Sequence, residues 1–139
     1  MALHDEGRCE VVREWLTDAE EGYQLAEHPL RTAVHFAKAI AFNSQQAAEK
    51  YLKALRTWHQ VEFPKTHDMA ELLGLVATVN PPLADGLEDA KSLTPFAAKM
   101  RYSHPPKPTV LRGARNAVHI AASVRGAVLA ALKPHLGDE

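Results

Sequence analysis

Apolar residues recur along this chain at intervals of three and four, the spacing that places them on one face of an α-helix. Five runs share this spacing, and they cover residues 8–27, 31–59, 67–79, 84–100 and 109–133. No stretch shows the two-residue alternation of a half-buried strand, and no Asn-Gly or Asp-Gly pair offers a tight hairpin turn. The pattern therefore predicts an all-α fold, an up-and-down antiparallel bundle of four to five helices.

The helical spacing also predicts which side chains face the core. The positions expected to point inward in the first, second and last helices are Val12, Trp15, Leu16, Ala19, Tyr23, Ala26, Ala47, Tyr51, Leu55, Trp58, Ala114, Ala117, Val118, Ala121, Val124, Val128 and Leu132. The second helix also carries apolar residues on more than one face near its start, from Val34 to Phe42. Such a helix packs on two partners, and in a small bundle one of them is often a second subunit.

Prolines and capping residues are expected to set the helix boundaries. His28–Pro29 should end the first helix, and Thr66 should cap the third. Thr94–Pro95 should kink or split the fourth, because proline removes a hydrogen bond and clashes with the preceding turn. Pro108 or Thr109 should open the last helix, and the tail from residue 134 to 139 should fray.

Length and composition predict one soluble domain over residues 1–139, with a core from about residue 8 to 133. The 139 residues are 46% hydrophobic, enough to bury a core without staples. A formal net charge of -1 leaves no global basic field for nucleic acid, so any RNA or nucleotide site must be a local patch. The single cysteine, Cys9, excludes an internal disulfide and indicates a reducing compartment. The opening MALHDEGRCEVV has no apolar run of a signal peptide, and no later stretch is apolar enough for a bilayer, so a cytoplasmic location is expected.

The chemistry concentrates between residues 43 and 68, NSQQAAEKYLKALRTWHQVEFPKTHD. A turn of about 100° per residue groups a set of polar side chains on one face of the second helix, and these are Gln46, Lys50, Lys53 and Thr57. Glu49 precedes Lys53 by four residues, the favourable order for a helical ion pair. His67 and Asp68 follow in the first turn of the next helix, near the end of the long one. The alternative is a solvated surface face with a histidine that only caps or packs.

This stretch resembles the signature of HEPN-domain proteins. The resemblance lies in the run from Gln45 to Leu55, QQAAEKYLKAL, and in the downstream PKTHD of residues 64–68. The aromatic and spaced alanines from Trp15 to Ala26 fit as well, and so does Arg101-Tyr102, where many relatives carry Arg-Tyr-Pro. The similarity extends from about residue 8 to 132.

The resemblance implies a helical bundle that forms a homodimer and works beside a minimal nucleotidyltransferase, in many cases as a toxin–antitoxin pair. It implies a site for a nucleotide or another phosphate-bearing ligand, and the residues that carry over to it are Gln46, Lys50, Lys53, His67, Arg101 and Tyr102. Lysine and arginine donate to phosphate oxygens, and a tyrosine ring stacks on a base. By the same analogy, Tyr102 is a candidate acceptor of a nucleotidyl group from the partner enzyme.

A metal-independent endoribonuclease is the alternative that the resemblance leaves open. That activity needs an arginine, four to six further residues and a histidine, which supply charge and general acid–base groups in a dimer. Arg101 and His104 have only two residues between them, whereas Arg112 and His119 have six and lie about 20° apart on the polar face of the last helix. With half of the 16 basic residues being arginine and with 8 histidines, roughly one such pair arises by chance.

The sequence contains no recognisable motif for binding a metal or a cofactor. No HExxH or CxxC spacing occurs, and the 7 glycines form no phosphate loop, so neither a metal nor a cofactor is expected. A third alternative is an interaction module without enzymatic activity, whose lysines are solvated.

Overall fold

The computed structural model describes residues 5–32, 37–62, 65–66, 68–97 and 108–136. Its elements are α1 (Asp5–Thr32), α2 (Ala37–Trp58), α3 (Met69–Ala77), α4 (Pro81–Gly86), the 3₁₀ helix η2 (Glu88–Ala97) and α5 (Pro108–Leu136). These described segments contain no strand, and the expected all-α bundle is confirmed.

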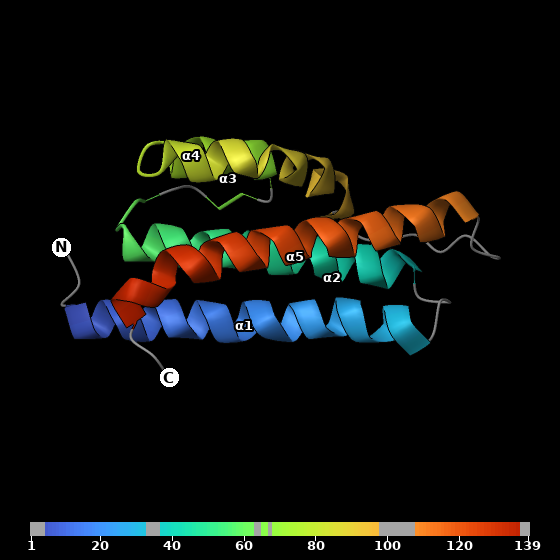
Figure 1. Ribbon diagram of the computed structural model, residues 1–139, viewed down its shortest axis with the longest axis horizontal. Helices are drawn as coiled ribbons and strands as arrows, with labels where there is room; N and C mark the ends of the chain where they lie inside the picture. The colour runs from blue at the N-terminus through green and yellow to red at the C-terminus, as the bar shows by residue number, and fades with distance from the viewer. Residues whose placement is uncertain (1–4, 33–36, 63–64, 67, 98–107, 137–139) are drawn as a thin grey trace.

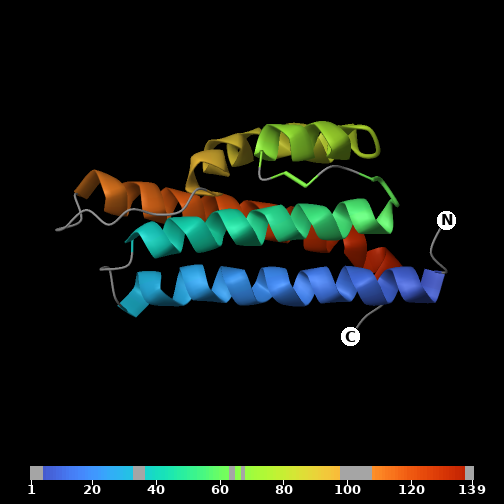
Figure 2. The ribbon, with the colours of Figure 1, turned by 180° about the vertical axis from the view of Figure 1, so that it is seen from behind.

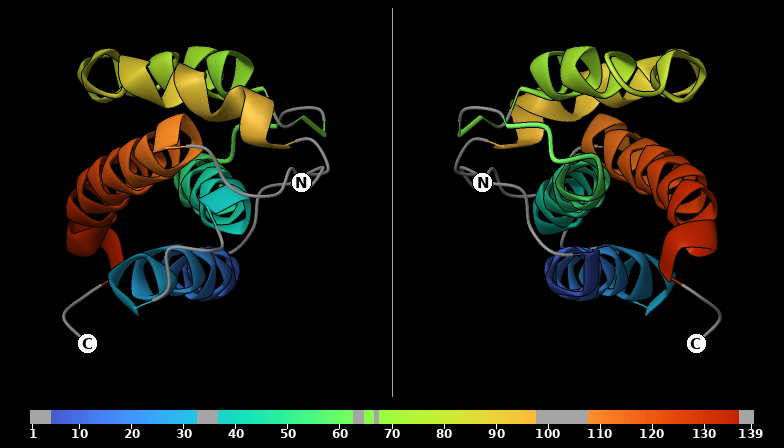
Figure 3. Two further views of the ribbon diagram at one scale, coloured as in Figure 1. Left: turned by 90° about the vertical axis from the view of Figure 1, so that its right-hand side faces the viewer. Right: turned by 90° about the vertical axis from the view of Figure 1, so that its left-hand side faces the viewer.

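Helix α2 is the central element. Seen end-on, it has α1 along one side, α5 along a second and the shorter layer of α3, α4 and η2 across a third (Figure 3). The long helices α1 and α5 run in opposite directions, so the start of α1 and the end of α5 lie at the same end of the bundle (Figure 1). Of the apolar residues expected near the start of this helix, Ala37 and Ala41 are buried within one chain and Phe42 is half-buried, while Val34 lies outside the described residues.

The core faces predicted from helical spacing are confirmed. In α5 all seven predicted inward positions are buried, from Ala114 to Leu132. In α1, Val12, Ala19 and Ala26 are fully buried, while the larger Trp15, Leu16 and Tyr23 pack against the core at its edge. Small residues bring α1 close to α2, because a Cβ built on Gly22 would lie 3.6 Å from Ala47 Cβ. The fit explains how alanine-rich faces make a dense core.

Two helices extend beyond the prolines that were expected to end them, so both predictions are wrong. Helix α1 continues through Pro29 to Thr32, and α5 continues through Pro134 to Leu136. A proline leaves the carbonyl four residues earlier without its helical donor. Here those carbonyls belong to Leu25 and Ala130, which are exposed, so water can take the place of the missing donor.

Other boundaries also differ from the expectation. Helix α2 begins at Ala37 and not near residue 31. The N-cap of α3 is Asp68, whose side chain accepts from Ala70 N at 2.9 Å, while Thr66 Oγ1 accepts from Asp68 N. The fourth helix begins earlier, at Pro81 behind the cap Asn80, and breaks at Leu87 before η2. Proline at a first helical position is favourable because its missing N–H would have had no partner there.

Side chains of α1 hold the C-terminal ends of α2 and α5. Arg8 Nη1 donates to Trp58 O at 3.1 Å, and Arg13 Nη2 donates to Leu136 O at 2.9 Å. The Arg8 guanidinium also lies 4.0 Å from the centroid of the Trp58 ring, which stacks on His135 at 4.5 Å. We call these four residues, Arg8, Arg13, Trp58 and His135, the end clasp. Because it places cations on carbonyls at two helix C-termini, it satisfies orphan acceptors and opposes both helix dipoles.

We expect the end clasp to make the bundle sensitive to acid through His59. Partial burial, together with the positive charges of His135 and Arg8, lowers the pKa of His59 below its usual 6.5. The unfolded chain therefore binds a proton at about pH 6.5 that the folded chain resists, so stability is lost as pH falls from there towards the folded pKa. We expect His59→Gln to reduce the fall in thermal midpoint between about pH 7.5 and about pH 5.

Thermal unfolding followed by circular dichroism at both pH values measures this difference. His119→Gln is the matched control, since His119 is an exposed histidine on α5 and should leave the fall unchanged. An equal fall in wild type and His59→Gln would contradict the assignment.

Candidate functional site

The polar face of α2 is partly buried. Thr57 is 8% exposed, and the side chain of Lys53 is 15% exposed. Gln46 and Lys50 are half-buried on the same face. The face is thus neither fully solvated nor fully buried, and its buried polar atoms need partners.

A ladder of side-chain hydrogen bonds connects this face to the core. Gln46 Nε2 donates to Gln45 Oε1 at 2.7 Å, and Gln45 Nε2 donates to Glu49 Oε1 at 3.1 Å. Lys53 Nζ then donates to Glu49 Oε2 at 3.0 Å, so the predicted Glu49–Lys53 pair is confirmed. We call Gln45, Gln46, Glu49 and Lys53 the α2 polar ladder.

The side chain of Lys53 is held in its ion pair with Glu49. Glu49 is 2% exposed, and a buried carboxylate requires a nearby cation. The Lys53 ammonium also lies 5.6 Å from the ring centroid of Trp15, which adds an attraction from α1. A phosphate brought to Lys53 would meet the carboxylate of Glu49 a few ångströms further on. Lys53 therefore contributes to the fold first, because its charge is balanced by that of Glu49.

Lys50 is the other cation of this face, and it forms no such ion pair within the described residues. It is half-buried on α2, and within the described segments it has neither an ion pair nor a hydrogen bond from its side chain. Gln46 lies four residues before it, one turn along the same face. A lysine in this state keeps three donors for an external acceptor.

Four predicted site residues lie outside the described residues, and these are His67, Arg101, Tyr102 and His104. His67 follows Thr66 and precedes the α3 cap Asp68, both of which are described. Whether these four approach Lys50 stays a prediction.

The candidate ribonuclease pair lies on α5. Arg112 and His119 are both exposed, two turns apart on one face. His119 borders a small pocket of about 80 Å³ between α5 and the α4–η2 segment, which Asp89 and Ser123 also line. Figure 3 shows α5 on one side of α2, and Lys53 points about 160° away from Tyr51, the α2 residue in electrostatic contact with Arg125 of α5. Of the described candidates, Gln46 and Lys53 are thus directed away from α5, and the structure does not bring them together with Arg112 and His119.

A groove between α1 and α5 is a feature that the sequence did not reveal. It has a volume of about 480 Å³ and is lined by Leu16, Thr17, Gln24 and Leu129, among others. It exists because α1 and α5 both pack on α2 while making few contacts with each other. Its size is within the range of ligand sites, but it is open along its length.

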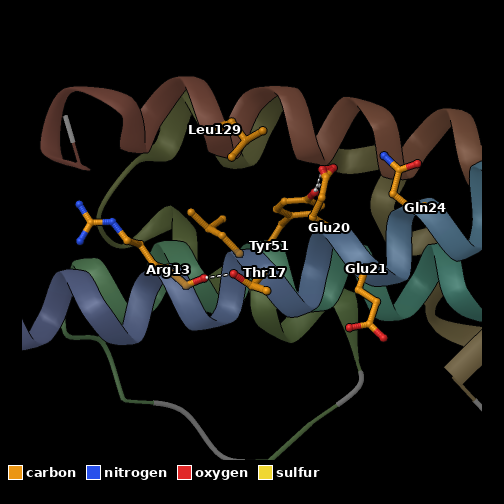
Figure 4. A pocket seen from close by; sticks show the side chains of 8 residues that line it. Arg13, Thr17, Glu20, Glu21, Gln24, Tyr51 and Leu129 are labelled. Carbon is orange, nitrogen blue, oxygen red and sulfur yellow. Dashed lines mark hydrogen bonds between the residues drawn. The ribbon is translucent and has the colours of Figure 1, made fainter. Parts of the chain in front are cut away.

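Glu20 and Tyr51 both line this groove (Figure 4), and Arg125 of α5 binds the same carboxylate. Arg125 Nε donates to Glu20 Oε1 at 2.7 Å, and Tyr51 Oη donates to the same oxygen at 3.3 Å. Burial, reinforced by the negative charge of Glu20, raises the pKa of Tyr51 well above its usual 10. The hydrogen bond to Glu20 likewise raises the pKa of Arg125. The phenol of Tyr51 is therefore neutral, while Glu20 and Arg125 form a charged pair. Together the three side chains join α1, α2 and α5 at one point.

One signal for this group was present in the sequence. A tyrosine on a buried face needs a partner for its hydroxyl, and Tyr51 is 0% exposed. The spacing placed Tyr51 in the core but could not say which polar residues of other helices would reach it.

Neither a metal site nor a membrane segment emerges from the described residues. They contain no group of three His, Cys, Asp or Glu side chains able to hold a metal ion. Among the same residues, no helix combines the length and apolar character needed to cross a bilayer.

Replacing Lys53 tests the α2 polar ladder. We expect Lys53→Ala to lower the free energy of unfolding by about 1–3 kcal/mol, because Glu49 would stay buried without its cation. Lys50→Ala is the matched control, and its effect should stay within about 0.5 kcal/mol. Urea unfolding of both variants measures the difference. Equal stability of the two would show that Glu49 does not depend on Lys53.

The sequence was compared with models of protein families, with curated proteins and with solved structures. Residues 12–131 match the family model described as HEPN domain. No match was found among curated proteins or among solved structures. The matched segment runs from the first turns of α1 nearly to the end of α5 and contains the α2 polar ladder and the groove. The chain therefore belongs to the HEPN domain family.

Proposed function

We propose that this HEPN domain binds a nucleotide or another phosphate-bearing ligand on the polar face of α2. The observation that carries the proposal is Lys50, a half-buried cation without an ion pair in the described part of the chain. Lys53 stands one turn beyond it, held in place by Glu49, and Gln46 stands one turn before it. Lys50 thus keeps its donors for phosphate oxygens, beside neighbours that are themselves held in place.

His67, Arg101 and Tyr102 complete the proposed site on the strength of the family resemblance. Arginine would bind phosphate oxygens with its planar fork, and tyrosine would stack on a base. Tyr102 is also the proposed acceptor of a nucleotidyl group. These roles are separate from that of Lys50 and can fail without it.

In this proposal the chain is the partner or toxin half of a pair with a minimal nucleotidyltransferase and acts as a homodimer in the cytoplasm. The support is membership of the family together with the ligand chemistry of the α2 face. A pair of this kind would let the enzyme deliver a nucleotidyl group to a protein that already binds nucleotides.

The proposal is tested by titrating the protein with ATP, and with adenosine as the ligand that lacks phosphate. We expect Lys50→Gln to weaken ATP binding about ten-fold or more, because one charge-assisted contact is lost. Adenosine binding should change little. Isothermal titration calorimetry measures both affinities.

Lys91→Gln is the matched control for this titration. Lys91 is an exposed lysine on η2 that pairs with Glu88, so its loss should leave ATP binding unchanged. No ATP binding by wild type, or equal weakening by both lysine variants, would reject the α2 site. Lys50→Gln is preferred to changes at Lys53, because the latter would disturb the α2 polar ladder as well.

An endoribonuclease is the second candidate, and one observation favours it. His119 is exposed at the edge of a pocket that also presents Asp89 and Ser123, and Arg112 lies on the same face. A histidine beside a recess has the access that general acid–base catalysis requires. Arg101 with His104 is the atypical alternative for this chemistry.

The ribonuclease candidate predicts cleavage of RNA in the presence of a chelator. We expect His119→Ala to reduce that cleavage at least about a hundred-fold, the contribution of one general acid or base. Gel analysis of end-labelled RNA measures it, with His28→Ala as the control for an exposed histidine on α1. Cleavage that survives the His119 change would exclude this pair. If neither ATP binding nor cleavage is found, the interaction module is the remaining function.

A further inference from the structure

The groove between α1 and α5 has the dimensions of a seat for another helix. In Figure 1, α5 lies in front of α2 and α1 runs antiparallel to it below, while Figure 2, from behind, shows α2 in front. Along α1 the groove is lined from Arg13 to Gln24. These positions span about 16 Å of helix, or three turns. Two antiparallel helices with such a groove between them can pack on a third helix at the same time.

Apolar side chains line the inner part of this groove. Leu16 of α1 and Leu129 of α5 are both half-buried, and they line it together with Tyr51 of α2. Beside Leu129, α5 carries the small residues Ala122 and Gly126, and a Cβ built on Gly126 would meet nothing within 4 Å. An incoming helix can therefore approach α5 closely and cover both leucines, which removes apolar surface from water.

The α1 edge of the groove is acidic. Exposed carboxylates follow the outer face of α1, and those within about 40° of the groove residue Thr17 are Glu6, Glu10 and Glu21. Glu21 itself lines the groove, and Glu6 and Glu10 stand four residues apart, where like charges weaken a helix. Within the described residues, none of the three carboxylates has an ion pair. The chain therefore leaves this row of negative charge without a balancing cation.

Two arginines beside the groove are held by groups of the chain. Arg13 Nη2 donates to Leu136 O at 2.9 Å and bridges α1 and α5 at one end of the groove. Arg125 Nε donates to Glu20 Oε1 at 2.7 Å. Helix α5 contains no aspartate or glutamate over its 29 residues, so the carboxylates lie on the α1 side. A partner should therefore carry its positive charge on the flank that faces α1.

We propose that the groove between α1 and α5 binds an amphipathic, basic helix of a partner protein. The apolar stripe of that helix covers Leu16 and Leu129, and lysine or arginine side chains on one flank reach Glu10 and Glu21. Binding of a helix in a groove combines apolar anchors with charges that fix its orientation. An RNA strand fits this surface less well, because the carboxylates repel its phosphates. The groove goes beyond the phosphate site on α2 and does not depend on it.

A designed peptide is the probe for this groove. It has about 18 residues, more than the 12–15 below which isolated helices are marginal, with leucine on one stripe and arginine along one flank. We expect Thr17→Trp to weaken peptide binding at least about ten-fold, because an indole at this exposed position fills the groove. Glu10→Gln with Glu21→Gln should weaken it about five-fold or more, since two charge pairs are lost. Fluorescence anisotropy at about 0.15 M salt measures the dissociation constants.

Asp18→Asn with Glu71→Gln is the matched control for the two glutamate changes. It removes the same charge from exposed positions, one about 100° from Thr17 on α1 and one on α3, and should leave peptide binding unchanged. A second peptide of the same composition, with leucine and arginine mixed around the helix, should bind at least about ten-fold more weakly. Circular dichroism confirms the fold of every variant.

Absence of peptide binding, or binding that Thr17→Trp leaves unchanged, would overturn the proposal. Equal weakening by the Glu10/Glu21 pair and by the control pair would overturn it too, because the attraction would then be one of net charge alone. A wild-type dimer that Thr17→Trp converts into a monomer in sedimentation equilibrium would assign the groove to a second copy instead. ATP affinity, measured on the same samples, reports the phosphate site separately.

Discussion

The bundle depends on how α2 carries polar groups at its centre. Glu49 is the one charged residue that is buried among the described residues, and Lys53 neutralises it one turn later. Gln45 donates to the other oxygen of the carboxylate and accepts a hydrogen bond from Gln46. Without these partners the burial of Glu49 would cost several kcal/mol. The ladder thus allows a helix with helices on three sides to keep one polar face.

The same dependence changes how a family signature is interpreted. The run from Gln45 to Leu55 resembled a ligand site because it concentrates glutamine and lysine. In the folded chain, Gln45, Glu49 and Lys53 hold one another, and Lys50 is the member left for an outside partner. Part of the signature therefore preserves a buried network, and a loss of binding on replacement of Lys53 would not by itself identify a ligand contact. Stability has to be measured beside affinity for each of these residues.

Sequence alone predicted the helices and their inward faces, because both follow from short-range periodicity. Val124, Val128 and Leu132 recur at intervals of four and are all fully buried. Boundaries were less predictable where distant residues override local signals. Pro134 was expected to end α5, yet Arg13 binds the carbonyl of Leu136, and the two lie 123 positions apart. No property of residues 134–139 contains that information.

The groove shows the same limit for the candidate site. Glu20 and Arg125 are separated by 105 positions, and their ion pair forms only because α1 and α5 both pack on α2. Periodicity assigns each side chain to a face of its own helix but not to a neighbour on another.

Charge segregation between α1 and α5 is different, since it is visible in the sequence once the helix boundaries are known. The antiparallel placement of the two helices puts the acidic N-terminal half of α1 beside the C-terminal half of α5, where Arg13 binds the carbonyl of Leu136 (Figure 1). The polar face of α2 is a separate surface, because Lys53 and Gln46 point about 140–160° away from Tyr51, which lines the groove. The proposed phosphate site on α2 and the ribonuclease candidate on α5 would therefore use different surfaces of the bundle.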